Sequence, residues 1–149
     1  MIWHIESPVM LYEDGSSEFS AGLWASSEKG KYIVTRKGYL SPVLSCGNFV
    51  LVNDALQQFF SRYAGEALSF EPAVIEDRVK QTITTGYWRL FSFDTFTLFP
   101  DQSIFDTKGI VLWLANDEYI FISDELKLLL ENHPVEGIHI SPGFGQFVN

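Results

Sequence analysis

Two stretches of the chain share one pattern: FVLVNDALQQFFSRYAGEALSFEP at residues 49–72 and YIFISDELKLLLENHPVEGIHISP at residues 119–142. Each opens with an apolar run, then has a small polar residue and an aspartate, and closes with alternating apolar residues before a proline. Between these ends, apolar residues recur at the i, i+3, i+4 and i+7 spacing of a helix with one buried face. The pattern predicts a strand, a helix and a strand in each stretch. Aligned without a gap, the stretches are identical at four positions 70 residues apart: Asp54 and Asp124, Leu56 and Leu126, Glu66 and Glu136, Pro72 and Pro142.

Both predicted helices have a capping residue at their start. Asn53 and Ser123 precede the helical pattern, and their side-chain oxygens can accept from free N–H groups of the first turn. Pro134 predicts that the second helix ends near Asn132 or His133. Helices of about ten residues do not persist alone in water, so each needs a sheet to lie on. Ser123 as a nucleophile and His133 as a ligand or base are the functional alternatives, but a cap and an apolar stripe explain both positions without further partners.

Length and composition predict one soluble domain that spans residues 1–149. The net charge of −9 disfavours binding to nucleic acid or to an anionic membrane. Cys46 is the only cysteine, so no disulfide within the chain is possible. The first residues lack the basic and apolar regions of a signal peptide, and the longest apolar run, residues 110–115, is too short to cross a bilayer. We therefore expect a cytoplasmic protein.

Further strands are predicted outside the two repeated stretches. The residues from 116 to 118 are typical of a tight hairpin connection, and the aromatic stretch 87–99 predicts one or two strands. We expect an α+β fold with a mixed, largely antiparallel sheet and two short helices packed against it. The other predicted strands lie at residues 2–5, 31–35, 79–85 and 110–115.

No motif of the sequence predicts a catalytic, cofactor or metal site. The three histidines and the lone cysteine lack the spacing of metal ligands. Gly143 and Gly145 have no helix behind them to hold a dinucleotide. Trp88 and Trp113 could stack on nucleic-acid bases, but the negative charge favours core packing for both. Adjacent carboxylates occur several times, and acid–base chemistry would need two carboxyls to converge on one bond. We expect these pairs to be solvated or to recognise a partner.

The order of these motifs resembles a bacterial immunity-protein family of polymorphic toxin systems, whose members end in a strand, a Ser-capped helix and a Gly- and Pro-bounded strand. The resemblance rests on YWRL at residues 87–90, IFISDEL at 120–126 and GIHISP at 137–142, with LVNDAL at 51–56 as the upstream counterpart. It covers about residues 49–142. The sequence departs from the family pattern at Asn53, where Ser is usual, and at Gly65, which precedes Glu66 instead of following it.

The resemblance implies a small cytoplasmic protein that binds and neutralises a cognate toxin domain without catalysis. It carries over no toxin-binding residues, because the motif residues are those that build the fold. A small hydrolase-like enzyme and an interaction domain unrelated to toxins are the alternatives. An enzyme would need a pocket with convergent polar groups. The resemblance leaves the oligomeric state open.

Acidic residues in loops are the candidate partner-binding residues, since the repeated units use their apolar faces for the core. Against a basic toxin domain, such charges would raise the association rate and make affinity fall with salt. The candidates form three adjacent pairs: Glu13 and Asp14, Glu76 and Asp77, Asp117 and Glu118.

Overall fold

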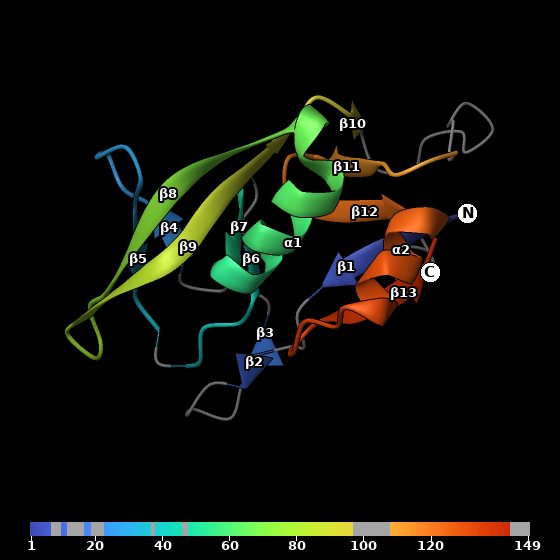
Figure 1. Cartoon of the computed structure of the whole chain (residues 1–149). Coiled ribbons are helices and arrows are strands. Elements are labelled where there is room, and N and C mark those ends of the chain that lie inside the picture. Colours follow the sequence, from blue (N-terminus) through green and yellow to red (C-terminus); the bar gives the residue numbers. More distant parts are fainter. Residues whose placement is uncertain are drawn as a thin grey trace.

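The computed structural model describes residues 1–6, 10–11, 17–18, 23–36, 38–45, 48–96 and 108–143. The chain is α+β, as expected, but its strands form two main sheets where the sequence predicted one (Figure 1). The six-stranded sheet has the order β4-β5-β8-β9-β7-β6, and the five-stranded sheet has the order β10-β11-β12-β1-β13. Neighbouring strands are antiparallel except for the pairs β5–β8 and β10–β11. A separate two-stranded ladder joins β2 (Met10–Leu11) and β3 (Ser17–Glu18).

Each repeated stretch forms the predicted strand, helix and strand, and each unit belongs to a different sheet. The elements of the six-stranded sheet and its helix are β4 (Leu23–Ala25), β5 (Lys31–Val34), β6 (Val43–Ser45), β7 (Val50–Asn53), α1 (Asp54–Ala64), the 3-10 helix η1 (Gly65–Ala67), β8 (Leu68–Asp77) and β9 (Thr82–Ser92). Those of the five-stranded sheet are β1 (Ile2–Glu6), β10 (Thr95–Phe96), β11 (Leu112–Ala115), β12 (Tyr119–Ser123), α2 (Asp124–Asn132) and β13 (His139–Pro142).

The duplication extends beyond the stretches that sequence alignment found. In the first unit β9 lies between β7 and β8, and in the second unit β1 lies between β12 and β13. Trp88 of β9 pairs with Val52 and Pro72, whereas Trp3 of β1 pairs with Ile122 and Pro142. The partners of Trp3 are each 70 residues after those of Trp88, the same offset as in the sequence repeat. Strand β1 therefore takes in the second unit the place that β9 takes in the first.

The correspondence between the two units includes one more strand in each. Strand β6 pairs antiparallel with β7 in the first unit, and β11 pairs antiparallel with β12 in the second. Tyr63 and His133, which are also 70 residues apart, stack on each other with ring centroids 5.5 Å apart. A contact between equivalent residues is what a two-fold relation between the units produces.

One apolar core lies between the two sheets and beneath both helices. It joins Leu56 and Phe60 of α1 to Leu126 and Leu130 of α2 and to residues of both sheets. Figure 1 shows α1 between the six-stranded sheet and the five-stranded sheet. Phe59 is 6% exposed, as its helical position predicts, and its counterpart Leu129 is half-buried against the same core.

Several predicted strand bounds were wrong, and the strand predicted at residues 110–115 begins only at Leu112. The strand placed at residues 79–85 begins at Thr82, because residues 78–81 form the turn between β8 and β9. It continues through Gly86, which has φ +84° at a bulge where β9 has one extra residue relative to β8. Strand β8 likewise continues past Pro72, because β5 begins to pair with β8 only at Val74 and the missing N–H of the proline faces no partner strand.

Candidate functional site

The first predicted acidic pair, Glu76 and Asp77, lies at the end of β8, and its two members differ in their surroundings. Asp77 is only 5% exposed, and its Oδ1 accepts from the backbone N–H groups of Val79 and Lys80, both at 2.9 Å. These bonds hold the turn into β9, as aspartate commonly does in turns. Glu76 is half-buried and forms ion pairs with Lys31 at 3.8 Å and with Arg78 at 3.6 Å.

The second pair, Asp117 and Glu118, lies in the predicted hairpin turn between β11 and β12. Asn116 and Asp117 have φ of 52° and 60°, and the N–H of Glu118 donates to the carbonyl of Ala115 at 3.1 Å. This is a type I′ turn, which favours Asn and Asp at its two central positions. Burial, together with the charge and the hydrogen bond of Glu118, raises the pKa of Tyr119.

The structure does not bring these two pairs together. Asp77 pairs with Thr82 at the start of β9, whereas Asp117 lines a small cavity of about 150 Å³ with Arg89 and Ser92 near the end of the same strand. At the rise of an extended strand, the two pairs are roughly 25 Å apart. The third pair, Glu13 and Asp14, lies outside the described residues.

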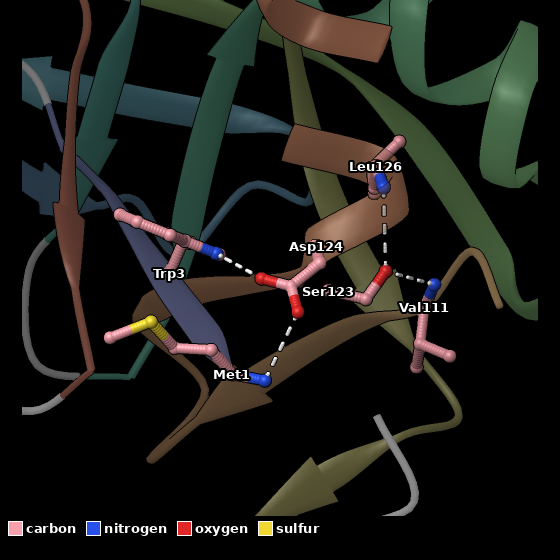
Figure 2. Close-up of polar contacts among 6 residues, drawn as sticks. All are labelled: Met1, Trp3, Val111, Ser123, Asp124 and Leu126. Carbon is pink, nitrogen blue, oxygen red and sulfur yellow. Dashed lines mark hydrogen bonds and ion pairs between the residues drawn. The ribbon is translucent and has the colours of Figure 1, made fainter. Parts of the chain in front are cut away.

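A carboxylate at the start of each helix binds a tryptophan from the central strand of its own unit. Figure 2 shows Asp124, whose Oδ1 accepts from the indole N–H of Trp3 at 2.7 Å and whose Oδ2 accepts from the Met1 amino group at 3.2 Å. In the first unit, Oδ1 of Asp54 accepts from the indole N–H of Trp88 at 2.6 Å. The hydrogen bonds from Trp3 and the amino group lower the pKa of Asp124. Sequence reasoning identified both aspartates as identical positions of the repeat but missed their tryptophan partners.

Both predicted caps are confirmed. The Asn53 side chain accepts from the N–H of Leu56 at 3.1 Å, and Oγ of Ser123 accepts from the N–H of Leu126 at 3.5 Å. Ser123 is fully buried, and its Oγ also accepts from the N–H of Val111 at 3.0 Å (Figure 2). The hydroxyl of Ser123 thus ties the loop before β11 to the start of α2, which is a structural task.

The tryptophans that could have formed a stacking platform pack inside the fold. Trp113 is 6% exposed, and Trp88 is half-buried against the main core. A larger cavity of about 780 Å³ lies beside the end of α1 and is lined by residues 61–68 with Phe70 and Ile110. Its charged lining residues, Arg62 and Glu66, are both exposed, so the cavity opens to solvent. The guanidinium of Arg62 lies over the Tyr63 ring, 5.2 Å from its centroid.

Exposed apolar side chains on the six-stranded sheet are another feature that sequence reasoning missed. Trp24, Val74 and Ile83 are 59%, 38% and 73% exposed. The available signal was the apolar run at residues 73–75 of β8, which puts apolar side chains on both faces of the strand. Ala73 and Ile75 are buried on one face, whereas Val74 on the other face is exposed.

Within the described part of the chain, no group of three or more His, Cys, Asp or Glu side chains is placed to hold a metal ion. In the same part of the chain, no helix is long and apolar enough to cross a membrane. No family model, curated protein or solved structure matches this chain.

Proposed function

We propose that this chain is an immunity protein, which binds a cognate bacterial toxin domain in the cytoplasm and neutralises it by occlusion, without catalysis. The observation that carries the proposal is the repeated unit on which the family resemblance rests. The sequence of strand, capped helix and strand occurs twice in the chain. Asn53 and Ser123 have the capping role that the resemblance assigns to this position.

The distribution of charge supports a protein partner that is basic. Residues 108–143 carry six acidic and two basic side chains, and the whole chain has a net charge of −9. A surface of this sign raises the rate at which a basic protein associates. A basic toxin domain is therefore the partner that the charge favours.

The test is to co-express the chain with the toxin domain encoded by the neighbouring gene and to measure growth and complex formation. We expect growth to be restored and the purified proteins to form a stable complex. Inhibition of the toxin should saturate at one equivalent of the chain, because occlusion consumes one binder for each toxin.

The matched control is Leu126→Asp, which places a charge at a fully buried core position and should abolish folding and protection together. Protection by substoichiometric amounts of the chain would contradict occlusion and favour the enzyme alternative. Absence of any complex between the purified proteins would contradict the proposal as a whole.

A further inference from the structure

The two helices turn equivalent faces to solvent, and these faces carry different side chains. Residues 54–58 of α1 and residues 124–128 of α2 show the same succession of exposed and buried positions. The second, fifth and eighth residues of each helix are exposed: Ala55, Gln58 and Ser61 in α1, and Glu125, Leu128 and Glu131 in α2. Residues three apart are neighbours on the surface of a helix, so each set forms one strip. Because the same unit folds with either set, the fold does not dictate these residues.

The strip on α2 combines an exposed leucine with two acids. Leu128 is 60% exposed, and Glu125 and Glu131 lie one turn before and one turn after it. The strip on α1 has no acid and no large apolar residue, since Gln58 takes the place of Leu128 and the nearest charge belongs to Arg62. The leucine and the acids of α2 are therefore a difference between the units that core packing does not explain.

The acids of α2 differ in how far the chain itself neutralises them. Asp124 is bound by the Met1 amino group and the Trp3 indole, and Glu131 forms an ion pair with Lys127. Lys127 also lies over the Trp3 ring, 4.1 Å from its centroid. Glu125, in contrast, has no ion-pair partner in the part of the chain that the structure describes. The strip on α2 thus keeps a negative charge that a cation of a partner can pair with.

The distribution of charge over the molecule identifies the class of partner that this strip suits. Residues 108–143, which include α2, carry six acidic and two basic side chains. Residues 23–36 and 71–83, which include β4, β5 and the hairpin end of β8 and β9, carry five basic and four acidic side chains. Figure 1 shows α2 at the opposite end of the molecule from β4 and β5. A basic protein is therefore attracted to the end that presents α2.

We propose that the outward face of α2, formed by Glu125, Leu128 and Glu131, is the docking surface for a basic toxin domain. This inference rests on the proposed function. An apolar side chain of the toxin covers Leu128, and a lysine or arginine beside it pairs with Glu125 in a charge-assisted hydrogen bond. The acids raise the rate of association and make it fall with salt, whereas the contact with Leu128 slows dissociation.

The repeat supplies matched variants for the test. Leu128→Lys is compared with Gln58→Lys, which adds the same charge at the equivalent exposed position of α1, and Glu125→Ala installs the residue that α1 has at position 55. Affinity for the toxin domain, association rate, melting temperature and molar mass in solution are measured for each variant and for the unaltered chain.

Leu128→Lys should bind at least about tenfold more weakly, because it places a cation against a basic surface. Glu125→Ala should associate about two- to tenfold more slowly at low salt, because it removes the unpaired acid. Gln58→Lys should bind within about twofold of the unaltered chain, because it lies outside the docking surface.

Several outcomes separate this inference from the proposed function. If the unaltered chain binds the toxin and both α2 variants bind within about twofold of it, the docking surface is wrong while the proposed function stands. If Gln58→Lys weakens binding as much as Leu128→Lys does, net charge is responsible and the inference is overturned. If the unaltered chain is a dimer that Leu128→Lys converts to a monomer, a second copy occupies the face of α2 and the inference is likewise overturned.

If the unaltered chain does not bind the toxin at all, both the proposed function and this inference fail. If Leu128→Lys lowers the melting temperature, Leu128→Gln decides the question, because α1 carries glutamine at the equivalent position. Leu128→Gln should bind about fivefold more weakly, since it loses the apolar contact with the toxin. Binding of a stable Leu128→Gln variant with unchanged affinity would overturn the inference.

Discussion

The first unit draws its central strand β9 from the residues that follow β8, whereas the second unit draws its central strand β1 from the other end of the chain. The pairing registers nevertheless agree, and each central strand donates an indole N–H to the aspartate that starts the helix. What the units share is therefore the set of contacts that build the fold. Within the described residues, only the first unit has a hairpin extension, residues 73–86, on which Val74 and Ile83 are exposed. Residues that are not needed to build the fold are free to recognise a partner.

The largest expected effect comes from removing equivalent core side chains. Phe59→Ala should lower the free energy of unfolding by about 3–5 kcal/mol, because Phe59 is buried between helix and sheet. Leu129→Ala should cost less, about 1–2 kcal/mol, because Leu129 is only half-buried. Urea denaturation of both variants would measure the difference. Equal losses would mean that the two helices pack more alike than their exposures indicate.

The two caps allow a sharper comparison. Asn53→Ala should cost about 1 kcal/mol, the usual value for a lost N-cap. Ser123→Ala should cost more, about 2 kcal/mol, because it also leaves the N–H of Val111 without its acceptor. Thermal unfolding would rank the variants, and Ser123→Thr, which keeps the hydroxyl, is the control. Toxin binding should survive in both alanine variants, so an inactive but fully stable Ser123→Ala would contradict the structural role.

Tyr87 distinguishes the first unit, since the equivalent position in β1 is Ile2. Its hydroxyl donates to the carbonyl of Ser41 at 2.8 Å, and burial raises the pKa of Tyr87 from 10.0 to about 12. Because the folded state favours the neutral phenol, the stability linked to Tyr87 is fully present below pH 10 and is lost as pH rises toward 12.

Tyr87→Phe should therefore cost about 1 kcal/mol at neutral pH and should remove part of the alkaline instability. Urea midpoints of both proteins at pH 8 and pH 11 would test this expectation. The unaltered chain should lose more stability between these two pH values than the variant does. Parallel losses would mean that Tyr87 does not titrate differently in the folded and unfolded states.

The smallest effects on stability are expected for the half-buried Glu76 and the exposed Asp117 of the acidic pairs. Glu76→Lys breaks two ion pairs and Asp117→Lys places lysine at a φ of 60°. Each variant should therefore lose up to about 1 kcal/mol of stability and should slow association with a basic toxin by about two- to tenfold at low salt. Asp77 is unsuitable for this comparison because it holds a turn. Stopped-flow association rates at two salt concentrations would measure the effect. If the association rate changes neither with salt nor with charge reversal, these residues do not steer the toxin electrostatically.

The repeated units and both caps could be predicted because they depend on spacing and on contacts three residues apart. The position of β1 in the sheet could not be predicted, because Trp3 pairs with Ile122 and Pro142, which are more than a hundred residues away. Sequence also could not show that Asp77 is buried in a turn while Glu76 next to it forms ion pairs on the sheet face. The exposure of Trp24, Val74 and Ile83 could not be predicted either, because it depends on which part of the sheet the rest of the chain covers.

The origin of β1 also sets the order in which the chain can fold during synthesis. The first unit is complete once residues 43–92 have emerged, since its four strands and its helix are contiguous. Strand β1 is made first but meets β12 and β13 only after residues 119–142, a delay of about ten seconds at ordinary translation rates. During that time an apolar strand with two unpaired edges is exposed on the nascent chain. Slow translation of the second half should therefore increase aggregation, and a chaperone that binds extended apolar segments should act on residues 2–6.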